Sequence, residues 1–111
     1  MKFIIAVKSG SIGSLNTAYS FLEAAIAQQK DHLITIEMVF FYQHGIYVLL
    51  NSEINQKWTD LLVNNNKSGF ICISSCNKRG INKNNIKNPF KPGSIIEFIN
   101  KCETAERVIY F

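Results

Sequence analysis

The stretch Lys2–Ser14, KFIIAVKSGSIGS, decides the fold. Its first part, Lys2–Val7, is a nearly continuous apolar run, which is typical of a strand buried on both faces of a parallel sheet. Ser9–Ser14 follows as a glycine-containing turn, and Leu15–Gln29 then carries apolar residues at helical spacing. A strand, a turn and a helix in this order begin a β-α-β unit.

The same pattern recurs along the rest of the chain. Apolar runs predict three further strands, at Leu33–Tyr42, Gly69–Ile73 and Arg107–Phe111. Two further helices are predicted, one capped by Ser52 and reaching Val63, the other capped by Ser94 and reaching Cys102. The core side of the last helix is expected to consist of four apolar residues, Ile95, Ile96, Phe98 and Ile99.

Two segments carry no regular pattern. Ile46–Leu50 is interpreted as a loop or a short helical turn, and Ser74–Pro92 as mostly loop with room for one helical turn. The resulting order predicts an α/β fold, a single domain over residues 1–111 with a doubly wound, mostly parallel, Rossmann-like sheet and helices on both faces.

In such sheets, functional groups gather beyond the carboxyl ends of the strands. Ser9–Ser14, Gln43–Tyr47 and Cys72–Arg79 each follow a predicted strand. We therefore expect these three segments to lie along one edge of the sheet.

The most chemically suggestive segment is Gly69–Gly80, GFICISSCNKRG. It places the Cys72 thiol at the end of an apolar strand, with Lys78 and Arg79 a few residues later. Neighbouring cations and free backbone amides favour the thiolate, which is the nucleophilic form of cysteine. This pattern predicts Cys72 as the reactive residue, with Lys78 and Arg79 as candidate thiolate-stabilising groups.

A different interpretation of Cys72 stays open, because free cysteines are among the most buried residues and pack as small hydrophobic side chains. Cys76 could be a second thiol of the same loop, but CxxxC is not a strong redox motif, so it is interpreted as a bystander. Cys102, at the end of a predicted helix, is expected to be structural.

Other candidate sites carry weaker signals. Ser9–Ser14 contains GxxG but neither GxGxxG nor a following GK[ST], so an ordinary turn is favoured over a nucleotide site. His44 follows a strand and could titrate near neutral pH, although a lone loop histidine is more often a surface residue. His32 carries no signal. No pattern indicates a hydrolytic triad or a set of metal ligands.

The composition, 47% hydrophobic and 18% charged, is that of a globular protein. The three cysteines lack zinc or CxxC spacing, no secretory signal is visible, and no apolar run approaches the roughly 18 residues of a membrane span. These features predict a cytoplasmic protein with reduced thiols. The net charge of +4 is not taken as a sign of nucleic-acid binding. Most of the positive charge comes from lysine, and the chain is also rich in Asn and Ile. The codons of all three residues are A/T-rich, so an A/T-biased genome would produce this charge without selection for nucleic-acid binding.

Five stretches carry a family resemblance: KFIIAVKSGSIGS, TAYSFLEAAIA, VFFYQHGIY, ICISSCNKRGI and ERVIYF. In this order the chain resembles the DsrE-type sulfurtransferase subunits, and among them most closely the TusD-like subunits of the TusBCD sulfur relay. Cys72 falls at the family's acceptor position, and Cys76 falls where the family usually has a small residue. The segments after Tyr47 and after Gly80 are shorter than is usual in the family.

The resemblance implies a DsrE-like fold and a persulfide carrier that accepts sulfur on Cys72 and passes it on for 2-thiolation of the tRNA wobble uridine. It implies no cofactor and no metal. TusB- and TusC-like subunits in a heterohexamer, and TusA- and TusE-like carrier proteins as donor and acceptor, are the implied partners. Contact with tRNA would be indirect, and no membrane contact is implied.

Two other functions stay open. The chain could be a non-catalytic structural subunit of such a complex, with Cys72 buried, or a flavodoxin-like nucleotide-binding module that uses the Ser9–Ser14 turn. The apolar residues of VFFYQHGIY also lead us to expect exposure in the free subunit, because neighbouring strand residues alternate faces. Some of Phe40, Phe41 and Tyr42 would then be covered only by a partner.

Overall fold

The computed structural model describes residues 1–29 and 33–111, so His32 lies outside the described residues. Within them the chain forms five strands, which are β1 (Lys2–Val7), β2 (Thr35–Phe41), β3 (Gly69–Cys72), β4 (Phe90–Gly93) and β5 (Arg107–Tyr110). The α-helices are α1 (Ile12–Gln29), α2 (Ser52–Asn64), α3 (Ile73–Lys78) and α4 (Ile95–Thr104), and two 3-10 segments are η1 (Gln43–Leu49) and η2 (Lys83–Asn85). None of the described helices is long and apolar enough to cross a membrane.

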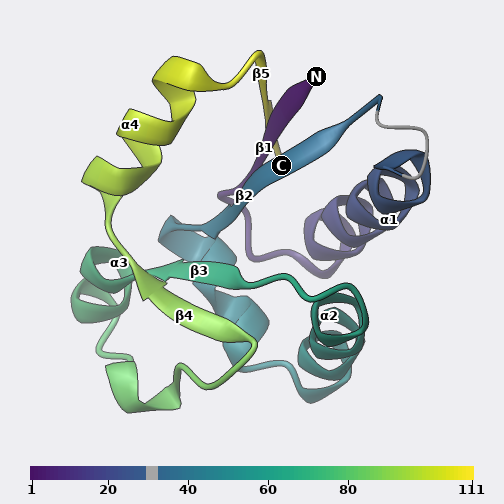
Figure 1. The fold of residues 1–111 in the computed structure, drawn as a ribbon. Coiled ribbons are helices and arrows are strands. Elements are labelled where there is room, and N and C mark those ends of the chain that lie inside the picture. The colour runs from purple at the N-terminus through teal and green to yellow at the C-terminus, as the bar shows by residue number, and fades with distance from the viewer. Residues whose placement is uncertain (30–32) are drawn as a thin grey trace.

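The strands form one sheet in the order β4-β3-β2-β1-β5, and every neighbouring pair is parallel. From β1 to β4 the chain moves steadily across the sheet, and it then returns over β3, β2 and β1 to place β5 at the far edge. Helices α1 and α2 lie on one face and α4 on the other (Figure 1). The predicted α/β sheet with helices on both faces is therefore confirmed.

Successive side chains along the strands point to opposite faces of the sheet, and they form one apolar layer on each face. On the face of α1 and α2, Val39 and Phe41 pack with Trp58, whereas Phe40 packs on the opposite face with Phe98 of α4. Phe40 and Phe41 are both 0% exposed. Helices on both faces therefore cover Phe40 and Phe41 within the subunit, whereas Tyr42 is half-buried, so an aromatic side chain covered only by a partner stays a prediction for Tyr42.

The sequence missed β4, whose four residues read Phe-Lys-Pro-Gly. This strand lies at an edge and pairs only with β3 in the described structure, so the missing N–H of proline removes no inter-strand hydrogen bond on its outer side.

The predicted capping role of Ser52 is also wrong. Asn51 caps α2, and its Oδ1 accepts a hydrogen bond from the Ile54 amide at 3.1 Å. Ser94 caps α4 as expected.

The apolar side of α4 is only partly covered. Phe98 is buried against the sheet, but Ile95, Ile96 and Ile99 are 40%, 68% and 52% exposed. The prediction that all four belong to the core is therefore wrong for the three isoleucines. The apolar sector of this helix is wider than the strip that contacts the sheet.

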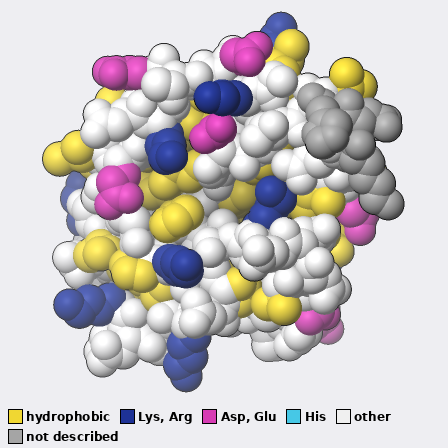
Figure 2. Space-filling model, in the orientation of Figure 1, with side chains coloured by type: hydrophobic (Ala, Val, Ile, Leu, Met, Phe, Trp, Pro, Cys, Tyr) yellow, Lys and Arg dark blue, Asp and Glu magenta, His cyan; other side chains and the backbone are white. Residues whose placement is uncertain are grey.

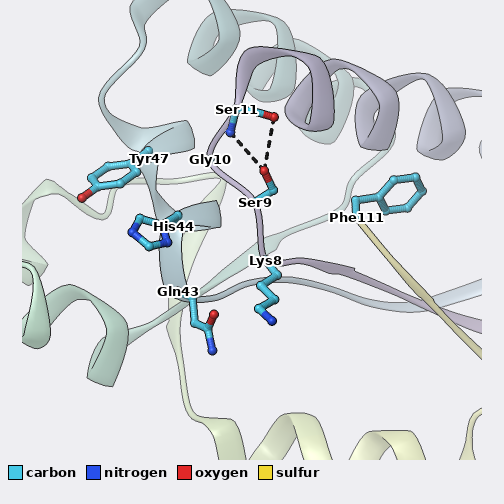
Figure 3. Close-up of a pocket in the computed structure, with 8 residues that line it drawn as sticks. All are labelled: Lys8, Ser9, Gly10, Ser11, Gln43, His44, Tyr47 and Phe111. Atoms are coloured by element: carbon cyan, nitrogen blue, oxygen red, sulfur yellow. Dashed lines mark hydrogen bonds between the residues drawn. The ribbon is translucent and has the colours of Figure 1, made fainter.

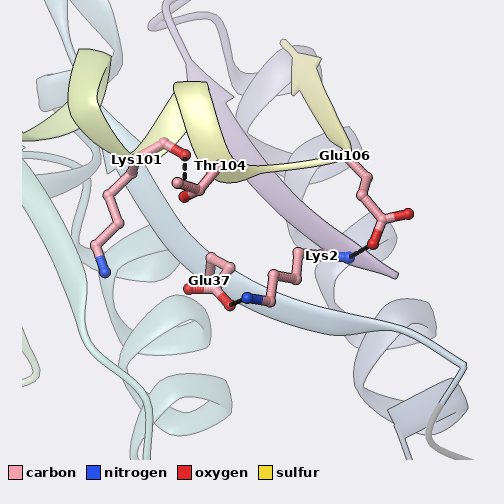
Figure 4. Close-up of polar contacts among 5 residues, drawn as sticks. All are labelled: Lys2, Glu37, Lys101, Thr104 and Glu106. Carbon is pink, nitrogen blue, oxygen red and sulfur yellow. Dashed lines mark hydrogen bonds and ion pairs between the residues drawn. The ribbon is translucent and has the colours of Figure 1, made fainter.

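Polar contacts at the amino edge of the sheet join β1 to its neighbours (Figure 4). Lys2 Nζ lies 4.0 Å from Glu37 Oε1, and the Lys2 amide donates to Glu106 Oε1 at 3.3 Å. Such exposed ion pairs contribute about 0–1 kcal/mol, so the two apolar layers hold the fold. On the face drawn in Figure 2, Lys and Arg are interspersed with acidic and apolar side chains and form no continuous basic surface.

Candidate functional site

The carboxyl ends of β3 and β4 lie where the chain changes face. After β3 it enters α3, whose Cys76 packs in the layer of α1 and α2. After β4 it enters α4, whose Phe98 packs in the opposite layer. Ligands of open parallel sheets bind at such a switch point, beyond the strand ends. Cys72 ends β3 here, in register with Gly93 of β4.

Cys72 is also the residue that precedes α3. Its backbone is extended, with φ −65° and ψ 114°. Its side chain packs in the layer between the sheet and α4, in a cluster with Met38, Phe40 and Phe98. Only 3% of Cys72 is exposed. The residue therefore has the predicted location at the sheet edge, but its sulfur is nearly covered in this conformation.

The two predicted cations lie at the other end of α3. Lys78 is exposed in the last turn. Arg79 turns back onto its own helix, and its Nη1 donates to the Ser75 carbonyl at 3.2 Å. No hydrogen bond joins either cation to Cys72 in the described part of the chain. Their role as thiolate-stabilising groups stays a prediction.

The other two thiols have environments that disfavour the thiolate. Burial raises the pKa of Cys76, negative charge on the nearby Cys72 raises it further, and the Arg79 guanidinium partly opposes both effects. Burial also raises the pKa of Cys102 on α4. Both thiols stay protonated at neutral pH, which suits a packing role better than nucleophilic attack.

Ser75 holds α3 in place, a role that sequence reasoning missed, because Ser75 has no signal beyond the small polar run in which it lies. It is 6% exposed, and its Oγ accepts a 2.7 Å hydrogen bond from the amide of Gln43. Gln43 has a positive φ of 50°, a conformation that costs energy for a residue with a side chain. The bond therefore ties the start of η1, after β2, to the helix that follows Cys72.

Replacing Ser75 with alanine is expected to lower the free energy of unfolding by about 1–2 kcal/mol, because the Gln43 amide loses its acceptor in a partly buried place. Ser74→Ala is the matched control, since Ser74 is exposed in the same helix. Urea unfolding of both variants measures the difference. Equal stabilities would show that the Ser75 hydroxyl does not anchor α3.

A second region of interest is a cavity of about 650 Å³ over the carboxyl ends of β1, β2 and β5. Figure 3 shows the eight residues around it, Lys8, Ser9, Gly10, Ser11, Gln43, His44, Tyr47 and Phe111. The structure thus brings His44 together with the Ser9–Ser14 turn, which no sequence pattern had linked. Cys72 does not line this cavity. No group of three His, Cys, Asp or Glu side chains that could hold a metal ion occurs among residues 1–29 and 33–111.

The fold and the position of Cys72 define a parallel α/β protein with a cysteine at its switch point. The chain belongs to the DsrE/DsrF-like family, whose model matches residues 1–111. This family is generally linked to sulfur relay. The crystal structure of the ychN protein from E. coli is similar, with a TM-score of 0.75, 19% identity and 100% of both chains covered, which shows a shared fold. No curated protein sequence gives a significant match.

Proposed function

We propose that the protein is a sulfur-relay subunit that carries sulfane sulfur on Cys72. The observation that supports this function best is a cysteine at the switch point of a DsrE/DsrF-like chain. In the proposed step, the Cys72 thiolate attacks the terminal sulfur of a donor cysteine persulfide. The new S–S bond forms on Cys72 as the donor S–S bond breaks, and the donor leaves as a thiolate, so no external oxidant or reductant is consumed.

The finer proposal is a TusD-like subunit in the cytoplasm, serving 2-thiolation of the tRNA wobble uridine. TusB- and TusC-like subunits would complete a heterohexamer, and TusA- and TusE-like carriers would exchange sulfur with it. The uncovered flank of α4, formed by Ile95, Ile96 and Ile99, supports a protein partner, because an apolar surface of this kind is usually covered in an assembly.

The first test is mass spectrometry after incubation with a persulfidated donor protein. We expect the peptide that contains Cys72 to gain the mass of one sulfur atom, and reduction with dithiothreitol to remove it. Sulfur found instead on Cys76 or Cys102, or on no cysteine, would contradict the proposal.

One observation favours a second candidate, a non-catalytic structural subunit of the same type of complex. Cys72 is 3% exposed and shares an apolar layer with Phe40 and Phe98. A relay cysteine must come into contact with a sulfur atom of another protein. The apolar layer between the sheet and α4 would therefore have to open at the carboxyl edge of the sheet, near the start of α4. In a structural subunit it would stay closed.

Alkylation of the native protein with iodoacetamide separates the two candidates. For the relay we expect Cys72 to react faster than Cys102 at pH 7, although Cys102 is the more exposed of the two. Because burial raises the pKa of Cys102, its labelling should become fast only at a pH above the ordinary thiol range. If Cys72 reacts only after unfolding, the structural subunit is the correct interpretation.

A further inference from the structure

We propose that the carboxyl edge of the sheet beside Cys72 carries a docking surface for an acidic protein, the partner that exchanges sulfur with Cys72. The surface is formed by the basic segment, residues 73–93, which runs through α3 and η2 into β4. The inference rests on the proposed sulfur relay, because the relay requires a second protein at this edge. It adds the chemistry by which that protein is recognised.

The basic segment is the part of the chain with the most one-sided charge. It contains five of the twelve Lys and Arg side chains, and no acidic residue occurs between Asp60 and Glu97. The other seven cations and the eight acidic side chains leave the rest of the chain with a net charge of −1. An A/T-biased genome explains many lysines, but it does not explain why the acidic residues are all outside this segment.

Two elements next to β3 carry these cations to the edge where Cys72 lies (Figure 1). Helix α3 begins directly after Cys72, and Lys78 in its last turn lies about 9 Å further along the helix axis. On the other side, β4 pairs with β3 and places Lys91 in register with Phe70. A separation of about 9 Å is close to the screening length at physiological salt, so charges on a partner at Cys72 still interact with these lysines.

Four cations of the basic segment are available to a partner. They are exposed lysines, namely Lys78, Lys83, Lys87 and Lys91. The one ion pair of the described residues joins Lys2 to Glu37, so none of the four lysines is paired with a described carboxylate. Acidic side chains of another protein are the complementary groups.

Two hollows adjoin η2, and each offers a lysine beside asparagine side chains. The first, of about 440 Å³, is lined by Asn82, Lys83 and Ile73, the last of which follows the relay cysteine. The second, of about 390 Å³, is lined by Lys87 and three asparagines. Neither hollow has an acidic lining residue. The Asn82 oxygen accepts from the Asn84 amide at 2.9 Å, which leaves the Asn82 NH₂ group as a donor to a carboxylate.

An acidic protein fits this surface better than RNA does. Single-stranded RNA is bound largely by stacking of its bases on exposed aromatic rings. The only aromatic residue of the basic segment, Phe90, is 3% exposed. Ile81 and Ile86 are half-buried, so they leave some apolar area between the lysines. A mixture of apolar and charged area is typical of protein–protein interfaces.

The first test measures binding of two fluorescent peptides to the full chain by anisotropy. The acidic peptide alternates Glu with Ser and Gly, and the neutral peptide has Gln in place of each Glu. We expect the acidic peptide to bind at least about tenfold more tightly at low salt, and this advantage to disappear at about 0.5 M NaCl because exposed charges are screened. Equal binding of the two peptides would overturn the proposal. Tighter binding of a single-stranded RNA with the same net charge as the acidic peptide would also overturn it.

Variants of two lysines locate the surface. Lys83→Gln and Lys87→Gln should each weaken binding of the acidic peptide about threefold, and the double variant about tenfold. These positions are chosen because Lys78 and Arg79 are also candidate thiolate-stabilising groups. Lys101→Gln, at an exposed position on α4, is the matched control and should leave binding unchanged. Thermal unfolding confirms that each variant is folded. Equal losses in Lys83→Gln and Lys101→Gln would show that binding follows net charge and not this surface.

A second test separates the docking surface from the sulfur relay. Each peptide is extended by one cysteine and loaded as its persulfide, and mass spectrometry follows the gain of sulfur on Cys72. We expect a faster gain from the acidic peptide, and we expect the double variant to remove the difference. Equal rates from the two peptides would overturn the docking surface and leave the relay standing. Selective binding of the acidic peptide with no sulfur on Cys72 would support the docking surface and contradict the relay.

Discussion

Replacing Cys72 with serine is expected to abolish sulfur acceptance from a persulfidated donor. The hydroxyl oxygen cannot form a persulfide, so the loss should be complete rather than partial. Because Cys72 lies in an apolar layer, serine should also cost about 1–2 kcal/mol of stability by burying a hydroxyl group. Cys72→Ala keeps the layer apolar and separates the two effects. Mass spectrometry reports the sulfur, and urea unfolding reports the stability.

The other two cysteines supply the controls. Cys76→Ser and Cys102→Ser should keep most of the sulfur acceptance, because burial keeps both native thiols protonated at neutral pH. Cys76 is 0% exposed, so its variant should still lose stability. An inactive Cys76→Ser with an active Cys72→Ser would move the site to Cys76. Loss of acceptance in both would indicate that the two thiols act as a pair.

The parts of the fold that the sequence predicted are those with strong local patterns. Continuous apolar runs located β1, β2 and β3 to within about two residues, and the serine before Ile95 located the start of α4. Strand β4 has no such pattern. Its position depends on pairing with β3 from across a polar loop, and long-range pairing of this kind leaves little trace in four residues that include lysine and proline.

Burial was harder to predict than secondary structure. Helical spacing identified the apolar sector of α4, but it does not say how much of that sector meets the sheet, and Ile96 is 68% exposed. The aromatic run Phe40–Tyr42 was expected to leave some side chains exposed. The return of the chain through α4 covers the second face and buries Phe40 and Phe41, whereas Tyr42 is half-buried.

In the candidate site, the position of Cys72 could be predicted from the sequence, but its contacts could not. The order of strands and helices along the chain is enough to locate Cys72 at the carboxyl edge of the sheet. Ser75 bonds to Gln43, 32 residues earlier in the chain, and Arg79 turns toward Ser75 instead of toward Cys72. The bond from Gln43 to Ser75 depends on how α3 packs against η1, which no local sequence rule sets, whereas the Arg79 contact lies within α3 itself.

Replacing Gly45 with alanine is expected to lower the free energy of unfolding by about 3 kcal/mol or more, the largest effect of any single methyl group that we propose to add. The new Cβ would lie 2.0 Å from the Val7 carbonyl oxygen. That carbonyl cannot move aside easily, because it accepts the Tyr42 amide at 3.0 Å and Val7, the last residue of β1, is 0% exposed. The clash must instead push η1 away from β1. Urea unfolding measures the loss.

Gly13→Ala is the matched control, and its effect should have the opposite sign. Gly13 lies in the first turn of α1, and nothing is within 4 Å of its added Cβ. Alanine there should stabilise the protein by about 0.5–1 kcal/mol, because it reduces the entropy of the unfolded chain. Similar stabilities of Gly45→Ala and Gly13→Ala would show that η1 does not contact β1 as closely as described.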